Sequence, residues 1–442
     1  MKLAMKLKFH IAALLSFVAI GSTNAQEYSL PQLLELAMKN DFSIQSAQLE
    51  ERKTNARIDE VKSALLPNVA VSGDYRRYFK IPGQVVPASA FGGPEGQYST
   101  LAFGLPYNLS TTAQVTQNLY NPSVKYALKA ANLNRELTSL STVKTKEDVA
   151  YNVTDAYYNL VTVVQQMAFL DSNLISLDRM HKVSDLLYQN KLGQRVDVDR
   201  ILINKTTTET QLATLKDNYS QLVNLLKYYT GTPQTDSLRI AINVSDVSLP
   251  AQAQDAELRR TDVALLNKQR DLNELQDKNI KSGFIPTVNA YGVANMAFYA
   301  KGGENSTFQD VPGYWAGLQL NWNVFDGMAR RAKRTQNQID NDKLNVQLRQ
   351  VKESIAMEEA NARNKFAVEQ RNINAKKDQV ALASRVYKQI QLQFKEGTVS
   401  LTDVIQAENS NLDAQSNYLT SLVQLLKAEL EWKKATGSLI QK

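Results

Sequence analysis

The sequence predicts a mainly α-helical protein that also contributes strands to a membrane β-barrel shared between several chains. Three observations predict this fold: an internal duplication, long stretches without helix-breaking residues, and segments in which apolar and polar residues alternate. Each copy of the duplicated unit is expected to run helix, strand, strand, long helix, helix. The helices are expected to pair as antiparallel coiled coils.

The chain opens with a basic, then apolar, then small-residue segment. Three lysines precede the apolar run Ile11–Ile20, and Thr23-Asn24-Ala25 suits cleavage by a signal peptidase. The apolar run is far shorter than the roughly 20 residues that a membrane-spanning helix needs. We therefore expect residues 1–25 to be a signal peptide and the exported chain to begin at Gln26.

Composition narrows the class of protein. Loss of the three leader lysines lowers the formal net charge from +7 to +4, which gives no reason to expect nucleic-acid binding. The sequence contains no cysteine, so neither disulfides nor a lipid anchor on an N-terminal cysteine is expected. After the leader no run of 18 apolar residues occurs, so we expect no membrane-spanning helix. The exported chain then stays soluble or enters a membrane as a barrel.

Four sequence landmarks recur in the same order and indicate a tandem duplication. The pairs are Ser63-Ala-Leu-Leu-Pro67 with Ser282-Gly-Phe-Ile-Pro286, Leu119-Tyr120-Asn121 with Val324-Phe325-Asp326, Gly193 and Asp199 with Gly397 and Asp403, and Thr230-Gly231 with Thr436-Gly437. We expect a first repeat at 26–230, an equatorial linker at 231–254, and a second repeat at 255–442.

Capping and breaking residues delimit the helices of the first repeat. Ser29 and Gln32 form a capping-box pattern, and Pro67 ends the helix that follows. Asn121-Pro122 suits the start of a long helix, and no proline follows before Gly193. The expected helices are about 30–64, 122–190 and 197–229.

Helix 197–229 carries apolar residues at alternating spacings of three and four, interrupted by Lys205 and Thr208. The last helix repeats this heptad seam, with apolar residues seven apart at Ile405, Leu412, Leu419 and Leu426. The helices expected in the second repeat are about 255–283, 328–394 and 401–435. In each repeat the two shorter helices together match the long one, which predicts an antiparallel coiled-coil rod about 100 Å long.

Four segments show strand-like alternation: about 68–79, 107–119, 287–299 and 313–325. In the last, one face is apolar and the other carries Gln319, Asn321 and Asn323; its expected lipid-facing residues are Tyr314, Leu318, Leu320 and Trp322. A soluble sandwich would show the same alternation. The strand length, the uncharged polar face and the interfacial aromatics favour a membrane.

Strands in lipid must belong to a closed barrel. Since about eight strands are the practical minimum, several chains must pool their four. Segments 80–106 and 301–313, which join the strand pairs, are rich in proline and glycine and are expected to be external loops.

From the first repeat onward, the chain resembles the TolC family of outer-membrane efflux channels. The motifs that carry the resemblance are the duplication, Leu66-Pro67 and Ile285-Pro286, Val324-Phe325-Asp326-Gly327, the turn Gly397-Thr-Val-Ser-Leu-Thr-Asp403, and Ala435-Thr436-Gly437. The resemblance implies a homotrimer with a 12-stranded outer-membrane barrel and a helical periplasmic tunnel. It implies a passive exit duct of a tripartite efflux or type I secretion system, working with a periplasmic adaptor and an inner-membrane pump, and residues 231–254 in a belt around the tunnel.

The resemblance also implies where the channel closes. In the family an acidic residue six positions after the turn glycine lines the inner end of the tunnel, and Asp403 and Asp199 match that position. Rings of carboxylates around a narrow axis repel one another and attract cations. Asp197 and Arg195 complete the expected gate. Ser400 and Asp403 also fit a capping box, which remains an alternative.

Two features qualify this gate and extend it. A second acid found in the family one turn further on is Gln406 here, so a single ring would constrict less strongly. The helix turns at Gly193 and Gly397 are the expected adaptor contacts. A basic cluster, Arg330, Arg331, Lys333 and Arg334, either grips anionic headgroups or forms a solvated first helical turn.

Nothing in the sequence predicts catalysis. The lone histidine after the leader, His181, has no second ligand nearby, and no catalytic or phosphate-binding motif occurs. We therefore expect no enzyme activity, no cofactor and no bound metal. The alternative to an exit duct is a soluble periplasmic coiled-coil protein, either an adaptor or a spacer. An adaptor would carry β-rich domains around one helical hairpin, without duplication.

Overall fold

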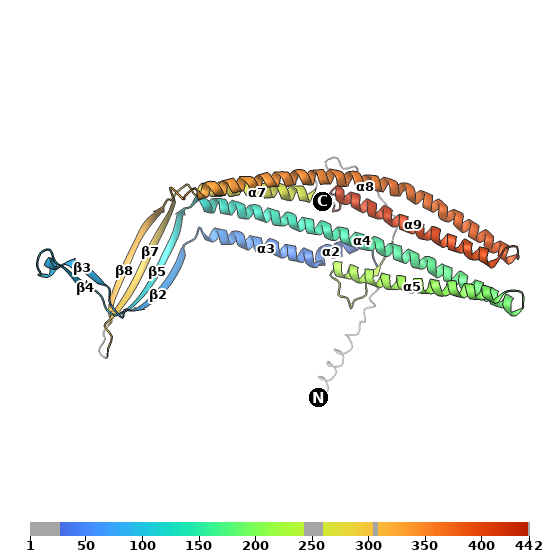
Figure 1. Cartoon of the computed structure of the whole chain (residues 1–442), viewed down its shortest axis with the longest axis horizontal. Coiled ribbons are helices and arrows are strands. Elements are labelled where there is room, and N and C mark those ends of the chain that lie inside the picture. Colours follow the sequence, from blue (N-terminus) through green and yellow to red (C-terminus); the bar gives the residue numbers. More distant parts are fainter. Residues whose placement is uncertain (1–26, 243–259, 304–307, 441–442) are drawn as a thin grey trace, which may run out of the picture. The chain divides into compact units, whose positions relative to one another are not determined.

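A computed structural model of the chain describes residues 27–242, 260–303 and 308–440 (Figure 1). Its helices are α2 (Leu30–Asn40), α3 (Phe42–Ser63), α4 (Pro122–Gln189), α5 (Arg195–Tyr229), α7 (Thr261–Ser282), α8 (Ala329–Lys395) and α9 (Leu401–Ala435). Its strands are β1 (Glu27–Tyr28), β2 (Asn68–Arg77), β3 (Gly83–Pro87), β4 (Tyr98–Ala102), β5 (Tyr107–Tyr120), β6 (Arg239–Ile240), β7 (Thr287–Ala300) and β8 (Gln309–Asn321). The expected signal peptide, the second half of the expected linker and the expected start of helix 255–283 lie outside the described residues.

The chain divides into two compact units. One, the helical unit, comprises Met1–Gln48, Thr142–Thr261 and Val351–Lys442, and the other, the sheet unit, comprises Leu49–Ser141 and Asp262–Gln350. The helical unit contains α2, α5 and α9 in full, together with parts of α3, α4 and α8. The sheet unit contains the main sheet, with the adjoining parts of α3, α4, α7 and α8.

The expected single helix 30–64 is wrong, because the chain breaks at Asp41 into α2 and α3. Asp41 is extended, at φ −60° and ψ 133°, and is buried. Its carboxylate accepts hydrogen bonds from the backbone N–H of Ser43 at 2.8 Å and of Ile44 at 3.2 Å, so it caps α3. The backbone of Gly231 also approaches Asn40 closely: a Cβ there would lie 2.5 Å from the Asn40 carbonyl oxygen.

The core of the helical unit surrounds the middle of α4. Leu33 and Ile44, from α2 and α3, and Leu226 of α5 pack there against α4 residues that include Leu160, and all four are fully buried. The helices α2 and α3, and also α5, therefore pack against the long helix α4. The polar interruptions of the α5 seam are accommodated: Lys205 pairs with Asp178 of α4 at 2.6 Å, and Thr208 bonds its own helix.

A second cluster joins α8 to α9, through Phe366 and Trp432 with their neighbours. A third cluster, Leu177, Met180, Ile201, Leu401 and Val404, joins α4 and α5 to α9 nearer the helix turns. Apolar contact thus holds the two helical hairpins, α4–α5 and α8–α9, together within the helical unit.

The sheet unit is built on a four-stranded antiparallel sheet in the order β2-β5-β7-β8 (Figure 1). The bounds expected for the last strand, about 313–325, are wrong: β8 runs from Gln309 to Asn321, so Trp322 lies beyond it. Pro312 sits within β8, opposite Met296. Proline cannot donate to a ladder, and Pro312 lies near the start of β8, which is an edge strand within the single chain.

The expected external loop 80–106 is also more ordered than predicted. It contains the antiparallel hairpin of β3 and β4, in which Gly83 pairs with Ala102, and a short 3₁₀ turn at Ala88–Phe91. Local pairing of these short strands satisfies backbone groups that the proline and glycine content seemed to leave unpaired.

The described part of the expected linker is tied to the helical unit. β6 pairs in parallel with β1, and the Tyr157 hydroxyl donates to the Ala241 carbonyl oxygen at 2.9 Å. Residues 243–254 lie outside the described part.

The sequence predicted no helix that could cross a membrane, but one described helix is long and apolar enough to do so. Helix α4 is long enough, and its most apolar 18-residue stretch reaches a mean hydropathy of 1.2. The same helix supplies Val153, Tyr157 and Leu160 to the core of the helical unit. A core helix can have the same length and composition as a membrane-spanning helix, so length and composition do not distinguish the two for α4.

Candidate functional site

The two turns between the long helices use their glycines differently. Gly397 lies at φ +72°, in the left-handed region, and the Thr398 N–H closes the end of α8 on the Gln393 carbonyl at 3.0 Å. In the first turn the left-handed residue is Lys191, at φ +59°. Gly193 instead allows a close approach, since a Cβ there would lie 3.2 Å from the Cβ of Leu187.

Asp403 caps α9 through a reciprocal box with Ser400. The Ser400 N–H and hydroxyl donate to Asp403 Oδ2 at 2.9 and 2.6 Å, and the Asp403 N–H donates to Ser400 Oγ at 3.3 Å. The hydrogen bond from the Ser400 side chain, followed by that from its backbone, lowers the pKa of Asp403 below its usual value. The carboxylate is therefore charged at neutral pH, and it is exposed.

The first turn carries an ion pair instead of a capping box. Arg195 Nε lies 3.1 Å from Asp199 Oδ1, one helical turn further along α5, and the guanidinium also stacks on Tyr188. Asp197 lies in the first turn of α5, where the helix dipole favours an acid. Arg195 and Asp199 are both largely exposed, and such pairs contribute little stability.

The structure brings the two turns together through residues that the sequence did not single out. Arg200 of α5 donates to the Thr402 hydroxyl of α9 at 2.9 Å, one residue from each predicted acid. A contact between residues 202 positions apart has no local pattern, because it depends on how the two hairpins pack.

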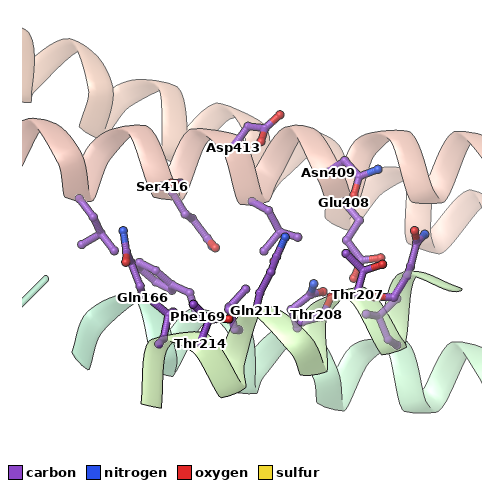
Figure 2. A pocket seen from close by; sticks show the side chains of 18 residues that line it. Gln166, Phe169, Thr207, Thr208, Gln211, Thr214, Glu408, Asn409, Asp413 and Ser416 are labelled. Atoms are coloured by element: carbon purple, nitrogen blue, oxygen red, sulfur yellow. Dashed lines mark hydrogen bonds between the residues drawn. The ribbon is translucent and has the colours of Figure 1, made fainter. Parts of the chain in front are cut away.

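Beyond these turns, a polar groove of about 720 Å³ lies between α4, α5 and α9 (Figure 2). Amide and hydroxyl side chains dominate its lining, which includes Gln166, Asn173, Asn204, Thr207, Thr208, Gln211, Thr214, Asn409 and Ser416. Two carboxylates also line it, Glu408 and Asp413. Glu408 was not predicted from the sequence, where a lone acid on a helix gives no signal of burial.

The basic cluster that begins α8 has two structural members. Arg330 is buried, lies 2.7 Å from Asp326 Oδ2, donates to the carbonyls of Gly283 and Asn323, and covers the Phe284 ring at 4.3 Å. Arg334 pairs with Asp277 of α7 at 3.0 Å. Arg331 and Lys333 are exposed. Arg330 therefore neither binds headgroups nor belongs to a solvated helical turn, the two roles expected from the sequence. It holds the end of β8 to the start of α8.

The expected lipid-facing residues lie on or just after the edge strand β8. Tyr314, Leu318 and Leu320 share one face of β8, and their exposed fractions are 74%, 71% and 62%. Trp322 is exposed beyond the strand end, and its indole N–H donates to the Phe284 carbonyl at 3.1 Å. An exposed apolar row of this kind, which no described residue covers, marks a surface that contacts a membrane or another protein.

Within the described ranges, no group of three or more His, Cys, Asp or Glu side chains could hold a metal ion. His181 lies on α4, half-buried.

Comparisons with known proteins agree over nearly the whole chain. Residues 33–232 and 253–438 match the family model described as outer membrane efflux protein. The chain is 19% identical over 430 residues to the outer membrane protein TolC of Escherichia coli (strain K12). The aligned region covers 95% of this chain and 84% of that protein.

Solved structures of outer-membrane channels share the fold. The outer-membrane channel OprN superposes with a TM-score of 0.70 at 17% identity, covering 92% of this chain and 90% of that one. The open state of the Neisseria gonorrhoeae MtrE outer membrane channel superposes with a TM-score of 0.71 at 16% identity, covering 93% and 89%.

Proposed function

The chain belongs to the outer membrane efflux protein family, and from that premise we propose that it is the passive exit duct of a tripartite efflux or type I secretion system. The protein resides in the outer membrane and extends into the periplasm. Its family consists of channel proteins, not enzymes. In the proposed system an inner-membrane pump supplies the energy and a periplasmic adaptor joins the pump to this chain.

The observation that carries the proposal is the incomplete sheet. Four antiparallel strands end in two open edges, β2 and β8. Open edges cannot exist in lipid, and four strands cannot close on themselves. We propose that three copies join β8 of one to β2 of the next, which makes a barrel of 12 strands. Tyr314, Leu318 and Leu320 would then face lipid.

We propose that the inner end of the duct closes around Asp403, with Asp199 in a supporting role. Asp403 is exposed and its lowered pKa keeps it charged, so three copies near one axis would attract cations and repel each other. Asp197 and Arg195 lie on the same turn as Asp199. The turns around Gly193 and Gly397 are the proposed contacts of the adaptor.

The capping role and the gating role of Asp403 can be separated with two matched variants. Asp403→Asn removes the charge but keeps an oxygen that can accept the Ser400 N–H. Ser400→Ala removes the hydroxyl half of the capping box and leaves the charge. Single-channel conductance and ion selectivity in planar bilayers would be measured for both variants and for the wild type.

If Asp403 gates the duct, Asp403→Asn raises the conductance or lowers the cation selectivity, and Ser400→Ala changes neither. If Asp403 only caps α9, neither variant changes the conductance, and any loss of helix stability appears mainly in Ser400→Ala. Folded oligomer extracted from membranes that never conducts would refute the exit duct and favour a structural role in the periplasm.

A further inference from the structure

A carboxyl group is buried where three long helices of the helical unit meet. Glu408 of α9 is 3% exposed and lines the polar groove from one side. Figure 2 shows it reaching from α9 toward the opposite wall of the groove, near Thr207 and Thr208. A buried carboxyl without a basic partner is costly when charged, so its protonation state affects how the surrounding helices pack.

A chain of hydrogen bonds leads from this carboxyl to the other hairpin. Tyr387 of α8 donates its hydroxyl to Glu408 Oε1 at 3.1 Å. The Tyr387 hydroxyl oxygen also lies 2.8 Å from Ser176 Oγ on α4. Gln391 of α8 donates to Tyr387 Oη at 2.8 Å. The bridge from Glu408 through Tyr387 to Ser176 therefore links the α8–α9 hairpin to the α4–α5 hairpin.

Among the described residues that surround Glu408, no basic side chain compensates a charge on it. From α4 and α5 the groove around it is lined by Asn173, Leu177, Asn204 and Thr208, all uncharged, and Lys205 of α5 is already paired with Asp178 of α4. From α8 the ionisable group in contact is Tyr387 itself, whose pKa is raised to about 12, so it stays neutral. From α9 the other groove acid, Asp413, is exposed and carries the same sign.

The packed arrangement therefore favours the neutral acid. Burial raises the pKa of Glu408 from 4.5 to about 7, against the smaller opposing effect of the Tyr387 hydrogen bond. A carboxyl whose pKa is raised by packing stabilises the packed state fully below its unperturbed pKa, and this contribution is lost as the pH rises through 7. A shift of this size corresponds to a change on the order of 100-fold in the packing equilibrium of each chain.

We propose that Glu408 is a pH-responsive latch between the two helical hairpins. In its neutral form the carboxyl stays buried, and the bridge through Tyr387 holds α4 against α8 and α9. In its ionised form the carboxylate gains hydration when the hairpins separate at this level. Resting on the proposed exit duct, the latch makes the duct open more readily above neutral pH than below it.

The first test measures open probability in planar bilayers at pH 5.5 and 8.5. Wild-type protein is expected to open at least 10-fold more often at pH 8.5. Glu408→Gln keeps the shape and the acceptor for Tyr387 but cannot ionise, so it is expected to stay at the low level at both values. Asp413→Asn, which neutralises the exposed acid of the same groove, is the matched control and is expected to follow the wild type. A Glu408→Gln profile identical to the wild type overturns the latch.

A second measurement does not depend on conduction. Since the chain has no cysteine, spin labels can be placed at the two helix turns through Gln194→Cys and Glu396→Cys, both exposed positions. With labelled chains diluted into unlabelled protein, the distance between the turns is expected to lengthen above pH 7 only when Glu408 is present. A distance that does not respond to pH overturns the latch even if the duct conducts. A responsive distance in protein that never conducts supports the latch and refutes the duct.

Discussion

Arg330 ties the end of β8 to the start of α8, and its loss should disturb this junction. Its side chain is only 8% exposed and donates hydrogen bonds to three acceptors: the Asp326 carboxylate, the Gly283 carbonyl and the Asn323 carbonyl. The planar guanidinium presents its donors as a fixed fork, whereas a lysine ammonium is a single point on a flexible stem. Arg330→Lys therefore keeps the charge and the Asp326 pair but removes the guanidinium donors from the carbonyls of Gly283 and Asn323, two exposed residues.

The size of the effect follows from those two carbonyls. A hydrogen bond to a charged group contributes about 1.5–3 kcal/mol net, and water can partly replace the lost donors at these exposed residues, so Arg330→Lys should lower the free energy of unfolding of the sheet unit by about 1–3 kcal/mol. Its neighbour Arg331 is exposed, so Arg331→Lys should change this free energy by no more than about 0.5 kcal/mol. The pair of variants compares the same chemical change at adjacent positions.

Trp322 offers a local signal for the assay. Its indole N–H bonds to the Phe284 carbonyl, next to the ring that Arg330 covers, and the chain has 3 tryptophans. With Trp315→Phe and Trp432→Phe as background, urea unfolding of protein in lipid vesicles can be followed by Trp322 fluorescence. Equal unfolding free energies for the Arg330 and Arg331 variants, within about 0.5 kcal/mol, would refute the reasoning.

Three further predictions concern the helices. Asp41→Ala removes the cap of α3 and should lower stability by about 1 kcal/mol in thermal unfolding followed by circular dichroism; no change would show that the break needs no cap. Leu226→Ala should cost about 2–5 kcal/mol in the same assay because the side chain is fully buried, while the half-exposed neighbour in Leu225→Ala should cost much less; equal losses would contradict the packing. Gly397→Ala should cost about 1 kcal/mol from its left-handed backbone alone, since no atom lies within 4 Å of the added Cβ, and a larger loss would indicate a contact at the turn.

The heptad spacing and the capping or helix-breaking residues were enough to predict most of the long helices. Asn121-Pro122 marks the start of α4, and the seam around Leu226 is buried as its heptad spacing indicated. The break at Asp41 was not predicted, although the residue that causes it is local. In an amphipathic stretch, a capping aspartate cannot be told from any other polar residue on the exposed face. The backbone of Gly231 passes close to Asn40 beside the break, and that approach is not local in sequence.

Strand limits were harder to predict than helix limits. Pro312 was taken for a loop residue because proline usually ends a strand, yet β8 is an edge strand and tolerates it. The register of β8 depends on its partner β7, and alternation alone does not state where the pairing stops.

The sequence by itself determined the mainly helical class and the alternation of the strands, because these follow from periods of two and seven along the chain. It also determined the family, through the order and spacing of the motifs that resemble it. Tertiary structure alone decided the environment of single side chains. It buried Glu408 and linked it to Ser176 through Tyr387, and it turned Arg330 from a surface charge into a structural one. The physical reason is that desolvation and hydrogen bonding depend on segments far apart in the chain, which no local pattern records.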